Sequence, residues 1–219
     1  MNMIDSSGKE TSATLAAYLS LREMILAGVL PAGEKLKIEQ LRKLLETGAS
    51  PVREALSLLT SDMLVERIDQ RGFRAAPASR ANFKEILNLR CALEDMACRQ
   101  SIAQADSDWE ERLVLSHHRM KRAAKTSNFE IAHKAFHMTL LSNAASPMLE
   151  RYCSQLYDLN IRYRYLAAAA ANYQRRDISA EHIDILDAAI GRNADVASKA
   201  LLTHYRLTGA YLSKQLRNM

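Results

Sequence analysis

Glycine and proline are scarce in this chain of 219 residues, which contains 7 Gly and 4 Pro. Because these residues form turns and end helices, their scarcity favours long helices over many short elements. No apolar run approaches the roughly 18 residues of a membrane-spanning helix; the longest candidate is LAAAAAN at 166–172. The N-terminal MNMIDSSGKETSAT lacks the pattern of a secretory signal. We therefore expect a mainly α-helical protein in the cytoplasm, with no membrane partner.

Cysteine is also rare, and Cys91, Cys98 and Cys153 have no spacing typical of a metal site. An odd number of cysteines argues against a disulfide framework and suits a reducing compartment. We expect all three to be small, buried, apolar side chains.

An excess of positive charge is missing from the first part of the chain, although the whole chain has a net charge of +5. Residues 1–78 hold ten Lys/Arg and ten Asp/Glu, whereas residues 79–219 hold twenty Lys/Arg and fifteen Asp/Glu. Global basicity is therefore no argument for DNA binding, and the excess instead hints at an anionic ligand in the second part. The length allows two domains of roughly 75 and 140 residues, each with its own core.

Residues 12–77 show the order of elements of a winged helix-turn-helix domain. Apolar residues recur at helical spacing in three segments, and two short strand-like segments follow, joined by Gln70-Arg71-Gly72. The predicted elements are helices at 12–28, 38–45 and 50–60, and strands at 64–69 and 72–77. In such a domain the third helix enters the major groove of DNA through its N-terminal end.

Two positions mark the ends of helices in this first domain. Gly28 stands where the first helix should stop. Ser50 followed by Pro51 is a favourable start for the third helix, since a serine caps the free amides and a proline is preset for the first turn.

From residue 79 onward the pattern is helical throughout, which predicts an antiparallel all-helical bundle over 79–216. The six predicted helices are roughly 80–103, 108–124, 128–145, 147–170, 177–191 and 194–216.

Four of the six histidines of the chain lie in this bundle at positions that could converge. His133 and His137 are four residues apart, so they share one face of a helix. His182 and His204 lie in two further helical segments. Four neutral imidazoles inside a bundle suit a divalent transition metal. Spacing alone leaves a second interpretation open, in which these are separate core or surface histidines.

The first domain resembles the DNA-binding domain of GntR-family bacterial transcription regulators. The resemblance is carried by ILAGVLPAGEKLKIEQL, by SPVREALSLL and by LVERIDQRGFRAAP. The second domain resembles the C-terminal FCD ligand-binding domain of the FadR-like subfamily, through RCALEDMA, AFHMTL and EHIDILDAAI. Within that subfamily, GAS-PVREAL and the later Ser146-Pro147 look closest to the carbon-starvation, or glutarate-type, regulators.

The resemblance implies that Ser50, Arg53, Arg71 and Gly72 contact DNA. Hydroxyl and guanidinium groups reach phosphates or guanine edges, and a glycine lets the wing backbone approach closely. Many family members have Ser-Arg-Thr-Pro at the turn, whereas this chain has an alanine, Ala49, in place of the first arginine. Alternatives remain: Arg53 could pair within its own helix region with Glu54 or Glu46, and Arg71 could be a solvated charge.

The resemblance also implies a metal site, which the FadR-like bundle builds from one Asp and three His. His137, His182 and His204 match the three histidines, and His133 stands where the family has the Asp. The site would then have four neutral ligands, and a divalent ion in it, zinc or nickel, would keep its full charge. It should therefore prefer an anionic ligand such as a small carboxylate.

Two arginines are candidates to bind that carboxylate, with Arg90 preferred and Arg162 second. Arg90 lies on an apolar helix face, where a charge needs a partner. An ion pair with Glu94, four residues on, is an equally good explanation. For Arg162 and Arg164, the alternative is a surface role for at least one of the two.

An all-helical metalloenzyme of hydrolase type is the alternative function. HKAFH at 133–137 has the histidine spacing of the HExxH metalloprotease helix, but Lys134 replaces the general-base Glu. Four protein ligands also leave less room for a reactive water. We therefore expect a regulator and not an enzyme: a homodimeric repressor that binds double-stranded DNA at an operator and responds to a small carboxylate.

Overall fold

A computed structural model of the chain describes residues 6–69, 71–124, 126–168 and 177–215. The described residues divide into two compact units. The first unit holds the residues up to Ser79 together with 161–168, and the second holds Arg80–Asn160 and 177–215.

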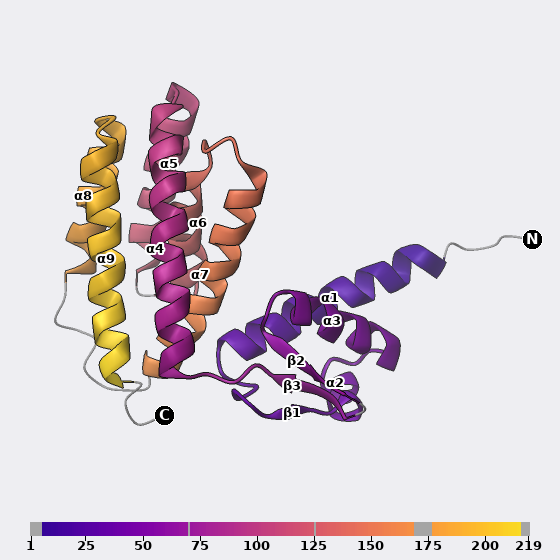
Figure 1. Cartoon of the computed structure of the whole chain (residues 1–219). Coiled ribbons are helices and arrows are strands. Elements are labelled where there is room, and N and C mark those ends of the chain that lie inside the picture. Colours follow the sequence, from indigo (N-terminus) through magenta and orange to yellow (C-terminus); the bar gives the residue numbers. More distant parts are fainter. Residues whose placement is uncertain (1–5, 70, 125, 169–176, 216–219) are drawn as a thin grey trace, which may run out of the picture. The chain divides into compact units, whose positions relative to one another are not determined.

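The first unit combines three helices with a small antiparallel sheet (Figure 1). Its elements are α1 (Ser6–Leu26), β1 (Lys35–Leu36), α2 (Ile38–Leu44), α3 (Ala49–Ser61), β2 (Val65–Ile68) and β3 (Gly72–Ala75). The strand order is β1-β3-β2, with Leu36 opposite Phe73 and Val65 opposite Ala75. The predicted winged helix-turn-helix is therefore present. The strand β1 was not predicted, because two residues are too short for an alternating pattern.

Buried aliphatic side chains hold α1 against α3 in this unit. Leu21 and Ile25 of α1 and Val52, Leu56 and Leu59 of α3 are almost fully buried. Because α3 spaces its buried residues three and four apart, its opposite face is left to solvent.

The two predicted helix signals of this unit have different outcomes. Gly28 has a φ of +77° just after α1, as expected for a residue that ends a helix. The predicted cap by Ser50 is wrong, because α3 begins at Ala49 with Gly48 as its N-cap and no side-chain cap. Ser50 therefore lies inside the first turn, where its hydroxyl is 3.4 Å from Glu54 Oε1.

The second unit is built from six helices (Figure 1). They are α4 (Arg80–Ala103), α5 (Ser107–Ala123), α6 (Phe129–Leu141), α7 (Pro147–Ala168), α8 (Ile178–Ile190) and α9 (Ala194–Gln215). The last turns of α7 are grouped with the first unit. Helix α4 packs on α9 and α6, and α5 packs on α6 and α8. The ends predicted at 170 and 216 lie outside the described residues.

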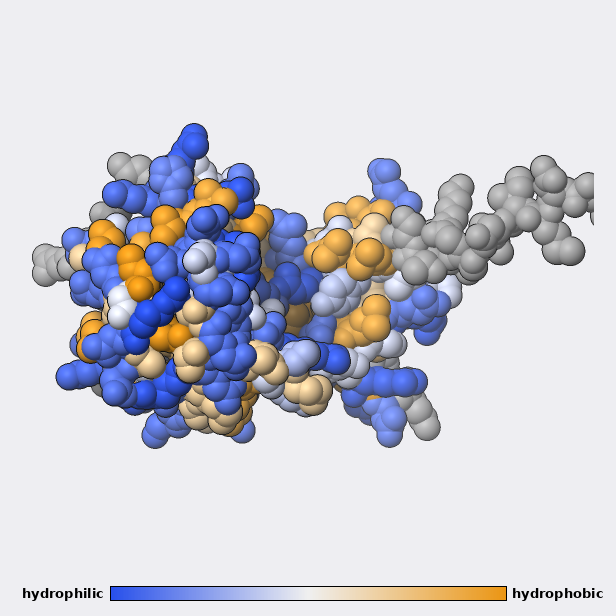
Figure 2. Space-filling view, turned by 90° about the horizontal axis from the view of Figure 1, so that it is seen from above, coloured by the Kyte–Doolittle hydropathy of each residue, from blue (hydrophilic) through white to orange (hydrophobic). Residues whose placement is uncertain are grey.

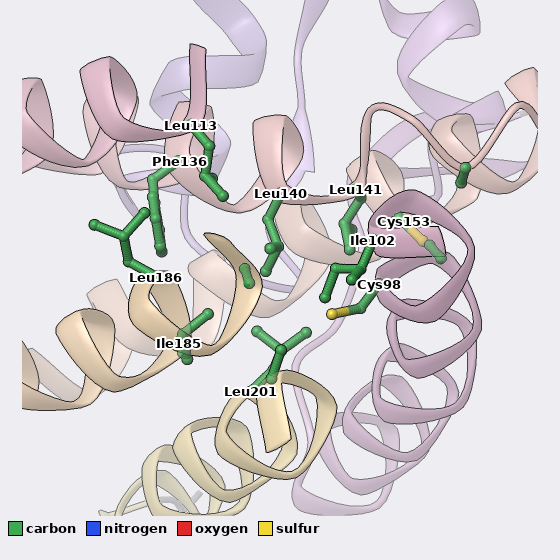
Figure 3. Close-up of a cluster of buried hydrophobic side chains, with 14 of the residues drawn as sticks. Cys98, Ile102, Leu113, Phe136, Leu140, Leu141, Cys153, Ile185, Leu186 and Leu201 are labelled. Atoms are coloured by element: carbon green, nitrogen blue, oxygen red, sulfur yellow. The ribbon is translucent and has the colours of Figure 1, made fainter. Parts of the chain in front are cut away.

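One apolar core lies between these helices (Figure 3). The side chains drawn there include Cys98, Leu113, Phe136, Cys153 and Leu201, which come from α4, α5, α6, α7 and α9. Burial raises the pKa of the Cys98 and Cys153 thiols to about 12, so both behave as apolar side chains. The third cysteine, Cys91, is only partly buried, so the expectation of three buried cysteines is wrong for it.

The surface is mainly hydrophilic on the face drawn in Figure 2, with hydrophobic residues between the polar ones. The exposed apolar side chains of the second unit include Leu89 and Met96 of α4. Being seven residues apart, these two lie on one face of the helix. Within the described stretches, no helix combines the length and the apolar character needed to cross a membrane.

Candidate functional site

The four predicted histidines meet inside the second unit. His133 and His137 come from α6, His182 from α8 and His204 from α9, and each is at most 5% exposed. One nitrogen from each ring lies within 4.8 Å of the others. The interpretation as separate histidines is therefore wrong, and the chain has a buried four-histidine cluster that could bind a metal.

The spacing of the ring nitrogens fits one metal ion. His133 Nε2 is 3.3 Å from His137 Nε2 and 3.1 Å from His182 Nε2. Two nitrogens that share a tetrahedral ion at about 2.0–2.1 Å are about 3.3 Å apart. Two bare ring nitrogens would repel each other at this distance, so the arrangement needs either a proton or a cation between them.

A second layer of side chains holds the outer nitrogens of three of these rings. Tyr157 Oη is 2.5 Å from His133 Nδ1, Tyr205 Oη is 2.9 Å from His137 Nδ1, and Glu181 Oε2 is 2.8 Å from His204 Nδ1. Such outer partners fix the tautomer and the orientation of a metal-binding histidine. The Glu181 carboxylate only accepts, so His204 donates from Nδ1 and its Nε2 lone pair is left for the cluster.

Arg90 lies behind this layer, between two tyrosine rings. Its guanidinium carbon is 4.0 Å from the centroid of the Tyr205 ring and 4.7 Å from that of Tyr157. Its Nε donates to Glu94 Oε1 at 2.5 Å and its Nη1 donates to Asn160 Oδ1 at 3.2 Å. The ion pair with Glu94, one of the two predicted explanations of Arg90, is therefore present.

The remaining nitrogen of Arg90, Nη2, is buried without a hydrogen-bond partner among the described residues. An unpaired buried donor costs free energy, so it marks a place where an acceptor would be stabilised. Burial acts to lower the pKa of Arg90, but Glu94 and the two tyrosines outweigh it, and the pKa is raised. The guanidinium thus stays charged in this apolar position.

Arg162 has a different environment from Arg90. It is buried in the first unit, where its Nη2 donates to the carbonyl oxygen of Ala76, and burial lowers its pKa. Of the two arginines for which a surface role was considered, Arg162 is therefore not the one at the surface. This contact gives Arg162 a structural role, and carboxylate binding by Arg162 stays a prediction. Arg164, two residues on, is partly buried.

Lys134, at the position of a metalloprotease general base, is held away from such a role. Its Nζ donates to Asp158 Oδ1 at 2.7 Å and lies 5.8 Å from the centroid of the Tyr157 ring. An ammonium group in an ion pair is a poor base, which removes the feature that the hydrolase alternative needs.

The predicted DNA-contacting residues lie on exposed parts of the first unit. Ser50 and Arg53 are exposed in the first two turns of α3, and Arg71 and Gly72 are exposed where β3 begins. Gly72 has a φ of +92°, a conformation that favours glycine. In the described part of the chain Arg53 and Arg71 have no ion-pair partner, so the predicted pairing of Arg53 with Glu54 or Glu46 is not formed.

The sequence did not predict the second layer of side chains, nor the hydrogen bond by which Glu54 joins α3 to α1. Tyr205 and Glu181 are each next in sequence to a cluster histidine, and this adjacency is the signal that could have drawn attention to them. Tyr157 and Asn160 carry no comparable signal. Glu54 accepts a hydrogen bond from Thr14 of α1 at 2.9 Å, a contact between segments 40 residues apart.

Comparisons with known proteins agree with this architecture. Residues 13–74 match the family described as bacterial regulatory proteins of the gntR family, and residues 85–207 match the FCD domain. The chain is 36% identical over 198 residues to the HTH-type transcriptional regulator BphR of Paraburkholderia xenovorans, a match that covers 86% of this chain and 80% of that protein.

A second relative and a solved structure extend the match. The HTH-type transcriptional repressor GlaR of Escherichia coli is 27% identical over 204 residues, covering 89% of this chain and 93% of that one. The fold is similar to that of E. coli McbR/YncC, with a TM-score of 0.80, 20% identity, and coverage of 93% and 98% of the two chains. The chain therefore belongs to the GntR family, carries an FCD domain, and is a DNA-binding transcriptional regulator, not an enzyme.

Proposed function

We propose that this regulator is a repressor whose operator binding is controlled by a small carboxylate, bound jointly by a metal ion in the four-histidine cluster and by Arg90. The observation that carries the proposal is the pairing of four neutral ligands with a buried guanidinium that lacks one partner. We also propose that the regulator acts in the cytoplasm and that its operator is double-stranded DNA.

Zinc is the metal we favour for the cluster, with nickel as the alternative. All-imidazole ligation suits both ions, and buried sites of four protein ligands are typical of zinc. His133 contributes a neutral nitrogen, and the carboxylate of Glu181 lies behind His204. A divalent ion bound there would keep most of its charge and would attract an anion as a fifth ligand, an expansion of the coordination shell that zinc permits.

Arg90 supplies the second half of the carboxylate site. Its unpaired nitrogen, Nη2, can donate a charge-assisted hydrogen bond to a carboxylate, and such a bond is directional as well as attractive. Tyr157 and Tyr205 connect the two halves, because each stacks on Arg90 and contacts one histidine of the cluster. Arg162 is our second choice, and its contact with Ala76 makes it the weaker one.

At the DNA we assign Ser50, Arg53, Arg71 and Gly72 to the interface. A single winged domain contacts too little DNA for strong specificity, so we infer that two chains bind a palindromic operator. Exposed apolar side chains such as Leu89 and Met96 offer a surface for a second copy. Light scattering of the purified protein should report a particle of two chains.

Calorimetry with small carboxylates tests the central part of the proposal. Succinate and glutarate serve as probes, titrated into zinc-loaded protein, chelator-treated protein and the zinc-loaded Arg90→Ala variant. We expect binding to the first sample and at least tenfold weaker binding to the other two. The Arg119→Ala variant, which removes an exposed arginine of α5, is the matched control and should bind as the unchanged protein does. Equal affinity in all samples would mean that neither the metal nor Arg90 holds the carboxylate.

A further inference from the structure

We propose that Glu94 positions two groups at once: through Tyr205 it fixes the tautomer of His137 for metal binding, and directly it holds Arg90 in place. The proposal deepens the proposed function, on which its second half rests, by naming a buried residue that joins the metal half and the anion half of one site. Glu94 touches neither metal nor carboxylate, so it is a positioning residue.

The direction of the hydrogen bonds follows from Glu94. Its Oε1 accepts from Arg90 Nε at 2.5 Å, and its Oε2 accepts from the hydroxyl of Tyr205. A carboxylate next to a guanidinium only accepts, so the Tyr205 proton must point to Glu94. The oxygen of Tyr205 is then left as an acceptor, 2.9 Å from His137 Nδ1.

The consequence for His137 is one defined tautomer. To donate to Tyr205 it must carry its hydrogen on Nδ1, which leaves Nε2 bare. That nitrogen is the one that lies 3.3 Å from His133 Nε2 in the cluster. The chain of contacts thus presents a lone pair to the place where a metal ion would bind.

Burial makes this series of hydrogen bonds sensitive to the loss of any one of its members. Glu94 and His137 are fully buried and Tyr205 is 2% exposed, so water cannot replace a lost partner. The three residues come from three helices, α4, α6 and α9. The direction of each hydrogen bond is therefore set by the other residues of the series. A change at Glu94 must then change the tautomer of His137.

The Glu94→Gln variant reverses the direction of the hydrogen bonds at Tyr205 and His137. Arg90 can only donate, so it retains the amide oxygen of the new side chain and the amide NH₂ faces Tyr205. Tyr205 then accepts from Gln and donates to His137 Nδ1, which moves the His137 hydrogen to Nε2 and blocks the lone pair. The Tyr205→Phe variant is a milder break: it leaves the Arg90–Glu94 ion pair intact and removes the acceptor of His137.

A matched control exists on the other side of the cluster. Glu181 contacts His204 Nδ1 at 2.8 Å, in the way that Tyr205 contacts His137. The Glu181→Gln variant makes the same chemical change beside a different histidine. It should alter His204 and leave the His137 tautomer as it is.

The first measurement is the tautomer of His137 in chelator-treated protein, read from nitrogen NMR of ¹⁵N-histidine-labelled samples. The His137→Gln variant identifies its signals. We expect the Nδ1–H form in the unchanged protein and in Glu181→Gln, the Nε2–H form in Glu94→Gln, and a mixture in Tyr205→Phe. The same tautomer in all four samples overturns the proposal. If Glu94→Gln does not fold, Tyr205→Phe decides alone.

The second measurement is zinc affinity, by competition with a chromophoric chelator. Outer partners of metal-binding histidines are typically worth 10–100-fold in metal affinity, and we expect this loss in Glu94→Gln and in Tyr205→Phe. The double variant should lose no more zinc affinity than the more affected single variant, because both changes act on the same series of hydrogen bonds. Unchanged affinity in both variants overturns the proposal.

These outcomes are distinguishable from failure of the proposed function. The NMR experiment uses metal-free protein and no carboxylate, so it tests the positioning of His137 whether or not a carboxylate is the effector. If no carboxylate binds but the tautomer and the zinc affinity follow Glu94, the proposed function fails and the positioning role stands.

Discussion

Arg53 is the residue on which we expect operator specificity to depend most. It is exposed in the second turn of α3, the helix that enters the major groove in this fold, and in the described part of the chain it has no ion-pair partner. Arg53→Ala should weaken operator binding by about 1–3 kcal/mol if the guanidinium reads a base. Fluorescence anisotropy at fixed salt measures the change.

The control for Arg53 removes one positive charge elsewhere. Lys84 is exposed at the start of α4, outside the winged domain. Lys84→Ala should leave both operator and non-specific affinity almost unchanged, whereas Arg53→Ala should weaken binding to the operator more than binding to random DNA. Equal losses on operator and on random DNA would assign Arg53 to phosphate contact.

His137 offers the direct test of the cluster as a metal site. It is fully buried and contacts both His133 and Tyr205. His137→Ala should reduce the zinc content of purified protein from about one ion per chain to a small fraction, because a tetrahedral site loses one of its four ligands. Elemental analysis before and after chelation measures this.

A histidine outside the cluster provides the comparison. His118 is exposed on α5, so His118→Ala should retain its zinc in full. If His137→Ala also retained its zinc, the ion would be bound elsewhere and the cluster would be a hydrogen-bonded group of buried histidines.

At the scale of single residues, the sequence predicted the four histidines and Arg90 but not their surroundings. His133 and His137 share a helix face by their spacing, and His182 and His204 lie in two further helical segments. The family resemblance then matched His137, His182 and His204 to metal ligands. Tyr157 and Asn160 were not predicted, because their contacts join α7 to α6 and α4, and sequence spacing carries no information on such pairs.

Helix α5 begins with a side-chain cap. Asp106 is its N-cap, and its carboxylate accepts from the backbone amide of Trp109 at 2.7 Å. Trp109 is fully buried, so this cap also fixes the point at which the helix enters the core. Asp106→Ala should lower the free energy of unfolding by about 1 kcal/mol, within a range of roughly 0.5–2 kcal/mol.

Two further variants separate the cap from the charge. Asp106→Asn retains an acceptor and should cost only a few tenths of a kcal/mol, since Asn and Asp cap almost equally well. Asp108, two residues on, forms an exposed ion pair with Arg112, and Asp108→Ala should cost less than about 1 kcal/mol. Urea unfolding gives the values. A larger loss for Asp108→Ala than for Asp106→Ala would contradict the assignment of the cap.

Element prediction worked where helices are long and failed where local chemistry decides. Helices α4 to α9 follow from their 3.6-residue periodicity and from the scarcity of glycine and proline. The start of α3 was misplaced by one residue, because Gly48 in an extended conformation precedes the helix and Ser50 bonds to Glu54 instead of capping. The strand β1 pairs with β3 through a register that only the folded chain defines.

For the whole molecule, the order of domains could be predicted, since PVREAL and the wing mark the first part and the four histidines mark the second. The division of α7 between the two units could not be predicted from the sequence. Its residues up to Asn160 are grouped with the bundle and 161–168 with the first unit, where Arg162 contacts Ala76. A continuous apolar periodicity does not reveal that the residues of one helix are divided between two units.

Regulation by a carboxylate requires that the operator site and the carboxylate site change each other's affinity by the same factor. If the carboxylate changes operator affinity by some factor, the operator must change carboxylate affinity by the same factor, because both binding orders reach one complex. We expect a factor of roughly 5–150, the usual range for coupled sites. Anisotropy with and without saturating glutarate gives one value, and calorimetry of glutarate with and without operator gives the other, both on zinc-loaded protein.

Arg90→Ala should bring both factors close to one while retaining operator affinity in the absence of glutarate. Arg53→Ala should retain glutarate affinity and reduce only operator binding. A carboxylate that binds tightly but leaves operator affinity unchanged would have no preference between the DNA-binding and non-binding states, and it would then be a ligand of the pocket without being the effector.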